Sequence, residues 1–179
     1  MKILKIVVIA IVAVVALLMG IGLVLPRDWN VERSILIRAE PAAIHRYVET
    51  PSTWREWFAW DDLRDDPSFK VTISGPASGV GAAYEWTGNL SGSGRIVITY
   101  SDPKSGIRFD EAIQRNEVNA KGSILYTSAD GGMTRVTWSD SGMLPAVIGG
   151  YFRGSVNEAL GKAFETSLGN LKSKVEGTK

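Results

Sequence analysis

FRGSVNEALGKAFETSLGNLKSKV, residues 152–175, is the stretch that decides the fold of this 179-residue chain. Its apolar residues recur every three or four positions, as Leu160, Phe164 and Leu168 do, and this spacing predicts one long amphipathic helix. Gly161 interrupts the pattern and costs a helix about 1 kcal/mol relative to alanine, so we expect close packing there. No other amphipathic segment is as long, and this helix is therefore the element expected to cover the apolar face of a sheet.

Upstream of this helix the sequence shows a series of strand patterns. Apolar residues alternate with polar ones, and glycine, proline, asparagine and aspartate separate the runs. The expected strands are residues 29–38, 69–73, 82–87, 95–100, 107–113, 123–127 and 134–139. Consecutive strands joined by short turns pair in antiparallel fashion, so an antiparallel sheet of about seven strands is predicted.

Two short helices are expected between the first and second strands. Pro41 suits the first turn of a helix, where the missing N–H removes no hydrogen bond. Thr50 followed by Pro51 predicts the start of a second short helix, with Thr50 as its N-cap. The order of elements is then strand, two helices, six strands and a long helix. It indicates an α+β fold, in which a curved antiparallel sheet encloses the C-terminal helix and leaves space for a ligand.

Four stretches of the sequence resemble the SRPBCC superfamily, the START-like helix-grip group that includes polyketide cyclase/dehydrase and lipid-transport proteins. They are VERSILIRAEPAAIHRYVETPSTWREWFAW (31–60), GPASGVGAAYEWTG (75–88), GGMTRVTW (131–138) and GKAFETSLGNLK (161–172). The resemblance covers nearly all of residues 29–174. It implies an apolar cavity between sheet and helix. It does not decide the function, because the group includes lipid carriers, hormone receptors, aromatic cyclases and oxygenase subunits.

The N-terminal segment is uniformly apolar. Residues 6–25 carry no charged side chain and follow Lys2 and Lys5. As a helix this run measures about 30 Å, the thickness of the hydrocarbon core of a bilayer. A cleaved signal peptide is the alternative, although its apolar region is usually shorter. We favour an uncleaved anchor, with residues 1–26 as a transmembrane helix, 27–179 as the helix-grip domain, and the bilayer contacting Ile6 to Leu25.

The orientation of this anchor is less strongly encoded. Basic residues flank the apolar run on both sides, so the positive-inside rule gives a nearly balanced count. A short basic N-terminal tail is typical of a signal-anchor, which places the domain outside the cytoplasm. We therefore expect a single-pass membrane protein with an extracytoplasmic domain.

Composition excludes several classes of function. The formal net charge is +1, which gives no basic excess for nucleic acid, and there are no cysteines and only one histidine. Thiolate zinc sites, cysteine nucleophiles and multi-histidine metal sites are excluded. We expect no metal and no cofactor. The single histidine, His45, is expected on the solvent-facing side of its helix with Arg46 and Glu49, without a catalytic role.

Aromatic side chains supply most of the candidate cavity lining. Trp54, Trp57 and Trp60 form either an aromatic gate or, as we favour, structural packing between the helices and the sheet. Further candidates come from the strands and the long helix. The full set of expected ligand-binding residues is Trp54, Trp57, Trp86, Phe109, Glu111, Tyr126, Trp138, Phe152 and Phe164.

Glu111 is the one carboxylate in this set. Strand alternation places it on the same face as Ile107, Phe109 and Ile113. A carboxyl group inside a cavity has a raised pKa and can orient a ligand hydroxyl or accept a proton. The alternative is a side chain that is exposed or neutralised by Arg95 or Arg135 from a neighbouring strand.

Three classes of function remain open. The favoured one is a membrane-anchored domain that holds a small hydrophobic ligand or lipid. The second is a cyclase or hydrolase that uses Glu111. The third is a domain that binds a partner protein and no ligand. The sequence identifies neither the ligand nor the oligomeric state.

Overall fold

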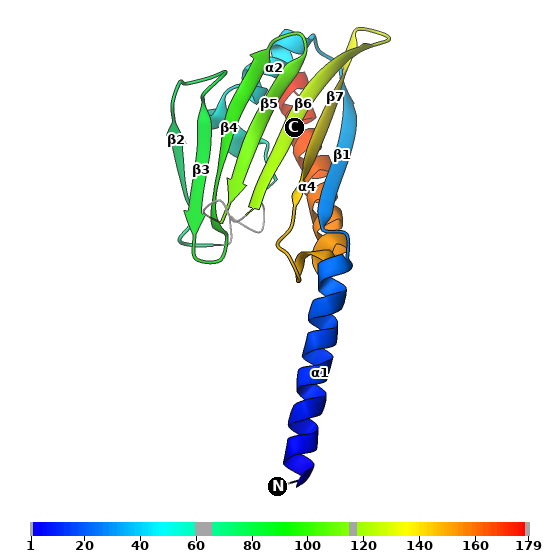
Figure 1. The fold of residues 1–179 in the computed structure, drawn as a ribbon. Helices are drawn as coiled ribbons and strands as arrows, with labels where there is room; N and C mark the ends of the chain where they lie inside the picture. The colour runs from blue at the N-terminus through cyan, green and yellow to red at the C-terminus, as the bar shows by residue number, and fades with distance from the viewer. Residues whose placement is uncertain (1, 60–65, 115–117, 178–179) are drawn as a thin grey trace.

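Seven antiparallel strands form a single sheet in the computed structural model, which describes residues 2–59, 66–114 and 118–177. Along the sheet the strand order is β1-β7-β6-β5-β4-β3-β2 (Figure 1). The strands are β1 (Asp28–Ile37), β2 (Lys70–Ser74), β3 (Ala83–Gly88), β4 (Gly92–Asp102), β5 (Gly106–Ile113), β6 (Val118–Ala129) and β7 (Met133–Met143). With the long helix α4 (Gly149–Glu176) against one face, the α+β helix-grip fold is confirmed.

Two short helices connect β1 to the rest of the sheet, as the prolines predict. Helix α2 (Pro41–Val48) begins at its proline. The second element, η1 (Pro51–Glu56), also begins at a proline, but it is a 3-10 helix. Thr50 occupies its N-cap position without forming a side-chain capping bond. The tight 3-10 winding ends before Trp57, which therefore lies in the segment that leads away from the helix.

Helix α4 packs mainly along β1. The guanidinium of Arg33 pairs with Glu165 at 2.5 Å, and Lys172 Nζ donates to the Leu36 carbonyl at 2.6 Å. A Cβ on Gly161 would lie 2.3 Å from an Arg33 nitrogen. The close packing expected at this glycine is therefore present, and its partner is a charged side chain from β1.

The sheet face toward α4, here called the inner face, carries the core. Strand register places Phe109 beside Gly122 and Ile98, and Ile124 beside Trp138. All four of these large side chains are at most 3% exposed. The alternation expected from the sequence is thus realised, with one apolar face buried against the helices.

Three strands, β4, β6 and β7, extend further than the sequence predicts, and each contains a glycine beyond its expected bounds. On the inner face an aromatic ring from the neighbouring strand lies over a glycine. A Cβ at these positions would approach the ring within 2.1–2.3 Å. The pairs are Trp86 over Gly94, Phe109 over Gly122, and Trp29 over Gly142. These glycines serve close packing inside strands and do not end them.

The N-terminal helix α1 (Lys2–Val24) projects from one end of the domain (Figure 1). Its span Ile3–Val24 has 22 residues and a mean hydropathy of 3.2, and only 6% of its most apolar window is buried. Such a helix is long and apolar enough to cross a bilayer. A signal sequence near the N-terminus has the same properties.

Candidate functional site

The inner face brings together most of the residues expected to line a cavity. Strand register places Trp86, Phe109, Glu111, Tyr126 and Trp138 on this face. Phe164 faces them from α4. Trp54 is buried in η1, and Trp57 is buried directly after it. Trp60 lies outside the described residues. A role of these side chains in ligand binding stays a prediction.

Phe152 does not belong with this group, and that expectation is corrected. Its side chain is 59% exposed in the first turn of α4. The helical spacing that includes Phe164 and Leu168 continues back to Phe152 in the sequence. At this end, however, α4 packs against α1 and the chain that follows it, through Tyr151 and Gly150, and Phe152 remains exposed.

An aromatic cluster joins the sheet, α4 and the segment after η1. The rings of Trp138 and Phe164 stack with centroids 4.4 Å apart. Phe58 lies 5.0 Å from Trp138, and Trp57 lies 5.9 Å from it at a steep angle. Trp54 donates from Nε1 to the Val48 carbonyl at 2.9 Å.

Two indole N–H groups in this cluster lack a hydrogen-bond partner. Nε1 of Trp57 and Nε1 of Trp138 are both buried and unpaired within the part of the chain that the structure describes. A buried donor without a partner costs on the order of 1–3 kcal/mol. Two such donors in neighbouring rings therefore mark a place where a hydrogen-bond acceptor from outside the chain would be stabilising.

Glu111 and Asp140 form an acidic pair on the inner face. Asp140 is 4% exposed, and its carboxylate accepts a bond of 2.6 Å from Trp29 Nε1. Its second oxygen leans toward β6, because a Cβ on Gly122 would lie 3.1 Å from it. Sequence reasoning found Glu111 and missed Asp140, although the alternation that buries Val136 and Trp138 continues to this residue.

Burial raises the pKa of both acids. Asp140 rises to about 6, because burial outweighs the stabilising bond from Trp29. Glu111 rises to about 8 through burial first and the nearby charge of Asp140 second. The two carboxyl groups therefore titrate as a pair that carries about one proton at neutral pH. Such a pair can donate a hydrogen bond and accept one at the same time.

His45 is buried, which corrects the expectation that it faces solvent. Its Nδ1 lies 3.3 Å from Tyr126 Oη, and its Nε2 lies 3.0 Å from Ser101 Oγ. Ser101 in turn donates to Glu49 at 3.3 Å. Burial lowers the pKa of His45, opposed by the charges of Glu49 and Asp102. Helix α2 buries Ile44, His45 and Val48 together, so its buried face is wide enough to include the histidine.

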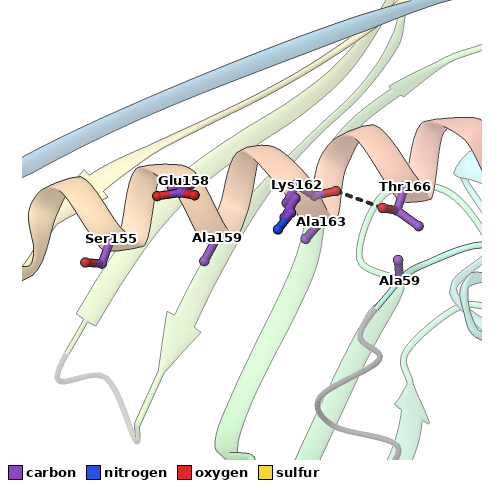
Figure 2. A pocket seen from close by; sticks show the side chains of 7 residues that line it. All are labelled: Ala59, Ser155, Glu158, Ala159, Lys162, Ala163 and Thr166. Carbon is purple, nitrogen blue, oxygen red and sulfur yellow. Dashed lines mark hydrogen bonds between the residues drawn. The ribbon is translucent and has the colours of Figure 1, made fainter.

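A groove runs along α4, outside the set of predicted residues. Its volume is about 390 Å³, and Figure 2 shows the lining side chains of α4 on the side that faces Ala59. Ala59 follows Phe58, and Ala163 precedes Phe164, so the groove borders the aromatic cluster. The residues that line it are Ala59, Ser155, Glu158, Ala159, Lys162, Ala163 and Thr166.

The groove combines a small apolar floor with a polar edge. Three of its residues are alanines, while Lys162 and Glu158 are exposed. Thr166 Oγ1 is occupied by a bond to the Lys162 carbonyl. No cluster of three or more His, Cys, Asp or Glu side chains among the described residues is arranged to hold a metal ion. The groove therefore suits an organic molecule with an apolar body.

Comparison with known proteins identifies relatives by family and by fold. Residues 28–176 match the sequence profile of the family described as polyketide cyclase/dehydrase and lipid transport. No curated protein matches the chain. Solved structures with the same fold include the Aha1 dimer from Colwellia psychrerythraea, at 18% identity and a TM-score of 0.59, which covers 84% of this chain and 98% of that one.

Two further structures show how widely the fold is used. Norcoclaurine synthase from Thalictrum flavum, solved with dopamine and hydroxybenzaldehyde, is 14% identical with a TM-score of 0.60, covering 89% of this chain and 92% of that one. A hypothetical protein from Helicobacter pylori is 11% identical with a TM-score of 0.62, covering 83% and 89%. At these identities the likeness shows the fold alone.

Proposed function

Because this chain belongs to the polyketide cyclase/dehydrase and lipid transport family of the SRPBCC superfamily, we propose that it is a membrane-anchored protein that binds a small hydrophobic ligand or lipid against α4, on the side that faces Ala59. The observation that carries the proposal is the 390 Å³ groove beside the aromatic cluster. Its volume lies within the range of small-molecule sites. Helix α1 supplies the anchor in this proposal, since almost none of its apolar surface is covered by the domain.

The polar groups of the interior restrict the ligand. The unpaired indole N–H groups of Trp57 and Trp138 favour a ligand with an acceptor oxygen. The Glu111–Asp140 pair favours a ligand with a hydroxyl or amine. We therefore propose an apolar molecule with one oxygenated or amino-substituted end, and not a pure hydrocarbon, because a hydrocarbon leaves the buried polar groups unsatisfied.

Filling the groove tests the proposal. Full-length protein is extracted in a mild detergent and examined by native mass spectrometry, where a copurifying apolar compound is expected. Ala163→Trp places a large ring in the groove and is expected to remove that compound. Ala77→Trp is the matched control, because Ala77 is exposed in the loop between β2 and β3. Wild-type protein without any bound compound, or Ala163→Trp with unchanged occupancy, contradicts the proposal.

An enzymatic role is the second candidate, and the acidic pair favours it. A carboxyl group with a pKa of about 8, as for Glu111, is protonated at neutral pH and can act as a general acid, while ionised Asp140 accepts a proton. A cyclase or hydrolase reaction would use this pair. Glu111→Gln is expected to abolish any turnover of the copurifying compound without releasing it. Unaltered turnover rejects the assignment.

A further inference from the structure

At the end of the domain where α1 meets α4, large apolar side chains are exposed to solvent. Their exposed fractions are 52% for Met143, 57% for Ile148, 45% for Tyr151 and 59% for Phe152. We call these four residues the base patch. They lie at the end of β7 and the start of α4, next to the point where α1 leaves the domain (Figure 1).

The base patch is fixed to α1 by specific contacts. Tyr151 Oη donates a hydrogen bond of 2.6 Å to the Leu18 carbonyl. Gly22 is buried, and a Cβ there would lie 1.9 Å from the carbonyl oxygen of Val147. Val147 adopts a φ of 69°, which is strained for a β-branched residue. The backbone is thus held in an unfavourable conformation where it contacts the apolar helix.

These contacts determine the depth of the patch once α1 is placed in a bilayer. Leu18 precedes Val24 by six residues, which corresponds to about 9 Å along the helix axis. Tyr151 reaches this level and must enter the membrane together with α1. Interfacial helices lie about 5–10 Å below the headgroup boundary, and tyrosine prefers that region.

Charged residues lie immediately above this level. Arg27 follows the apolar span and donates to the Leu144 carbonyl at 2.8 Å. Arg153 donates to the Asp28 carbonyl at 2.5 Å, just beyond Phe152. Arginine at this height suits the phosphate region of the bilayer. Along the membrane normal, the apolar patch therefore lies deeper and the arginines lie above it, which is the order that a membrane interface requires.

We propose that the base patch inserts into the membrane interface and holds the lower end of the α4 groove against the lipid. This inference rests on the proposed membrane anchor. Ser155, the first groove residue on α4, follows Phe152 by three residues, or about 4.5 Å of helix. A lipid-derived ligand then passes between bilayer and groove without crossing bulk water.

Site-specific labelling tests the insertion. The chain has no cysteine, so Phe152→Cys and Ile148→Cys each give one labelling site for a bimane fluorophore. The full-length variants are reconstituted in phosphatidylcholine vesicles with or without nitroxide-labelled lipid. We expect the bimane at both positions to be quenched at least about threefold more strongly than at a control position in water.

Val80→Cys is the matched control. Val80 is 58% exposed, and the neighbouring Gly79 N–H donates to the carbonyl of Glu49 at the end of α2. Helix α2 lies at the opposite end of the domain from α1 (Figure 1). The label at Val80 is therefore expected to remain unquenched by the lipid.

A label at a third position distinguishes insertion of the base patch from insertion of α1 alone. Ile11→Cys lies in the middle of α1, so its label is quenched whenever α1 is inserted. Quenching at Ile11 with none at Phe152 and Ile148 overturns the insertion of the patch and leaves the anchor intact. No quenching at Ile11 overturns both. Quenching at Ile11, Ile148 and Phe152, with none at Val80, supports the inference.

Discussion

At the scale of single residues, Glu111 is the group whose protonation should be measurable in stability. Its pKa rises from 4.5 to about 8 in the folded chain, through burial and then through Asp140. Between these pH values the folded chain retains a proton that the unfolded chain releases, so stability falls as pH rises. Glu111→Gln removes this effect. We expect it to raise the unfolding free energy by about 1–3 kcal/mol at pH 8 and little at pH 4.5.

Chemical denaturation of the full-length protein at the two pH values measures this difference. Glu85→Gln is the control, because Glu85 forms a cross-strand ion pair of 3.1 Å with Arg95 at the surface. That substitution removes an exposed pair, which contributes little. An equal effect of Glu111→Gln at both pH values would mean that Glu111 is not held in a protonated state.

His45 has the opposite dependence on pH. Burial lowers its pKa below 6.5, although Glu49 and Asp102 act against burial. The unfolded chain therefore binds a proton more readily, and stability is lost as pH falls below about 6.5. Protonation also puts an N–H on both ring nitrogens, of which Nδ1 lies 3.3 Å from Tyr126 Oη. We expect His45→Phe to reduce the loss of thermal stability between pH 6.5 and pH 5, measured by circular dichroism.

At the scale of elements, the sequence predicts all seven strands and three helices of the domain but not their full lengths. Proline at the start of each short helix and alternation in each strand are local signals, and both are realised. The ends of β4 and β6 were misassigned because Gly94 and Gly122 resemble turn residues. Their role depends on rings from neighbouring strands, Trp86 and Phe109. No local pattern reports such a contact.

Replacing one of these glycines tests this explanation. A Cβ on Gly122 would lie 2.1 Å from the Phe109 ring, so Gly122→Ala forces the ring toward α4. Overpacking of this kind costs about 1–3 kcal/mol. Gly154→Ala is the control, since nothing lies within 4 Å of its Cβ, and alanine is expected to stabilise the helix. Equal unfolding midpoints for the two variants would contradict the packing role.

The candidate site shows the same limit of sequence reasoning. Glu111 was found because alternation along a single strand places it on the inner face. Asp140 was missed although the alternation along β7 reaches it. The bonded chain of His45, Tyr126 and Ser101 was missed because it needs contacts between elements far apart in the sequence. The α4 groove was missed for a further reason. Its alanines and exposed polar residues are ordinary on a helix, and only the position of Ala59 turns them into one wall of a groove.

At the scale of the whole molecule, whether α1 is retained or cleaved decides how the domain works. A signal peptide leaves after export and has no reason to fit the mature domain, whereas Gly22 and Leu18 both contact the start of α4. We therefore expect the mature protein to retain α1. Intact-mass measurement of protein extracted from membranes checks this directly, because cleavage near Gly22 would remove more than 2 kDa, at about 0.11 kDa per residue.

The orientation of the retained helix gives the last expectation. With the domain outside the cytoplasm, a membrane-impermeant maleimide added to intact cells labels Val80→Cys, at the exposed end away from α1. Ile11→Cys, in the middle of α1, is the negative control. Labelling of Val80→Cys only after the cells are broken would place the domain in the cytoplasm. The anchor and the base patch are retained in either case, since both depend on the apolar surface and not on the side of the membrane, so orientation and attachment are decided by separate measurements.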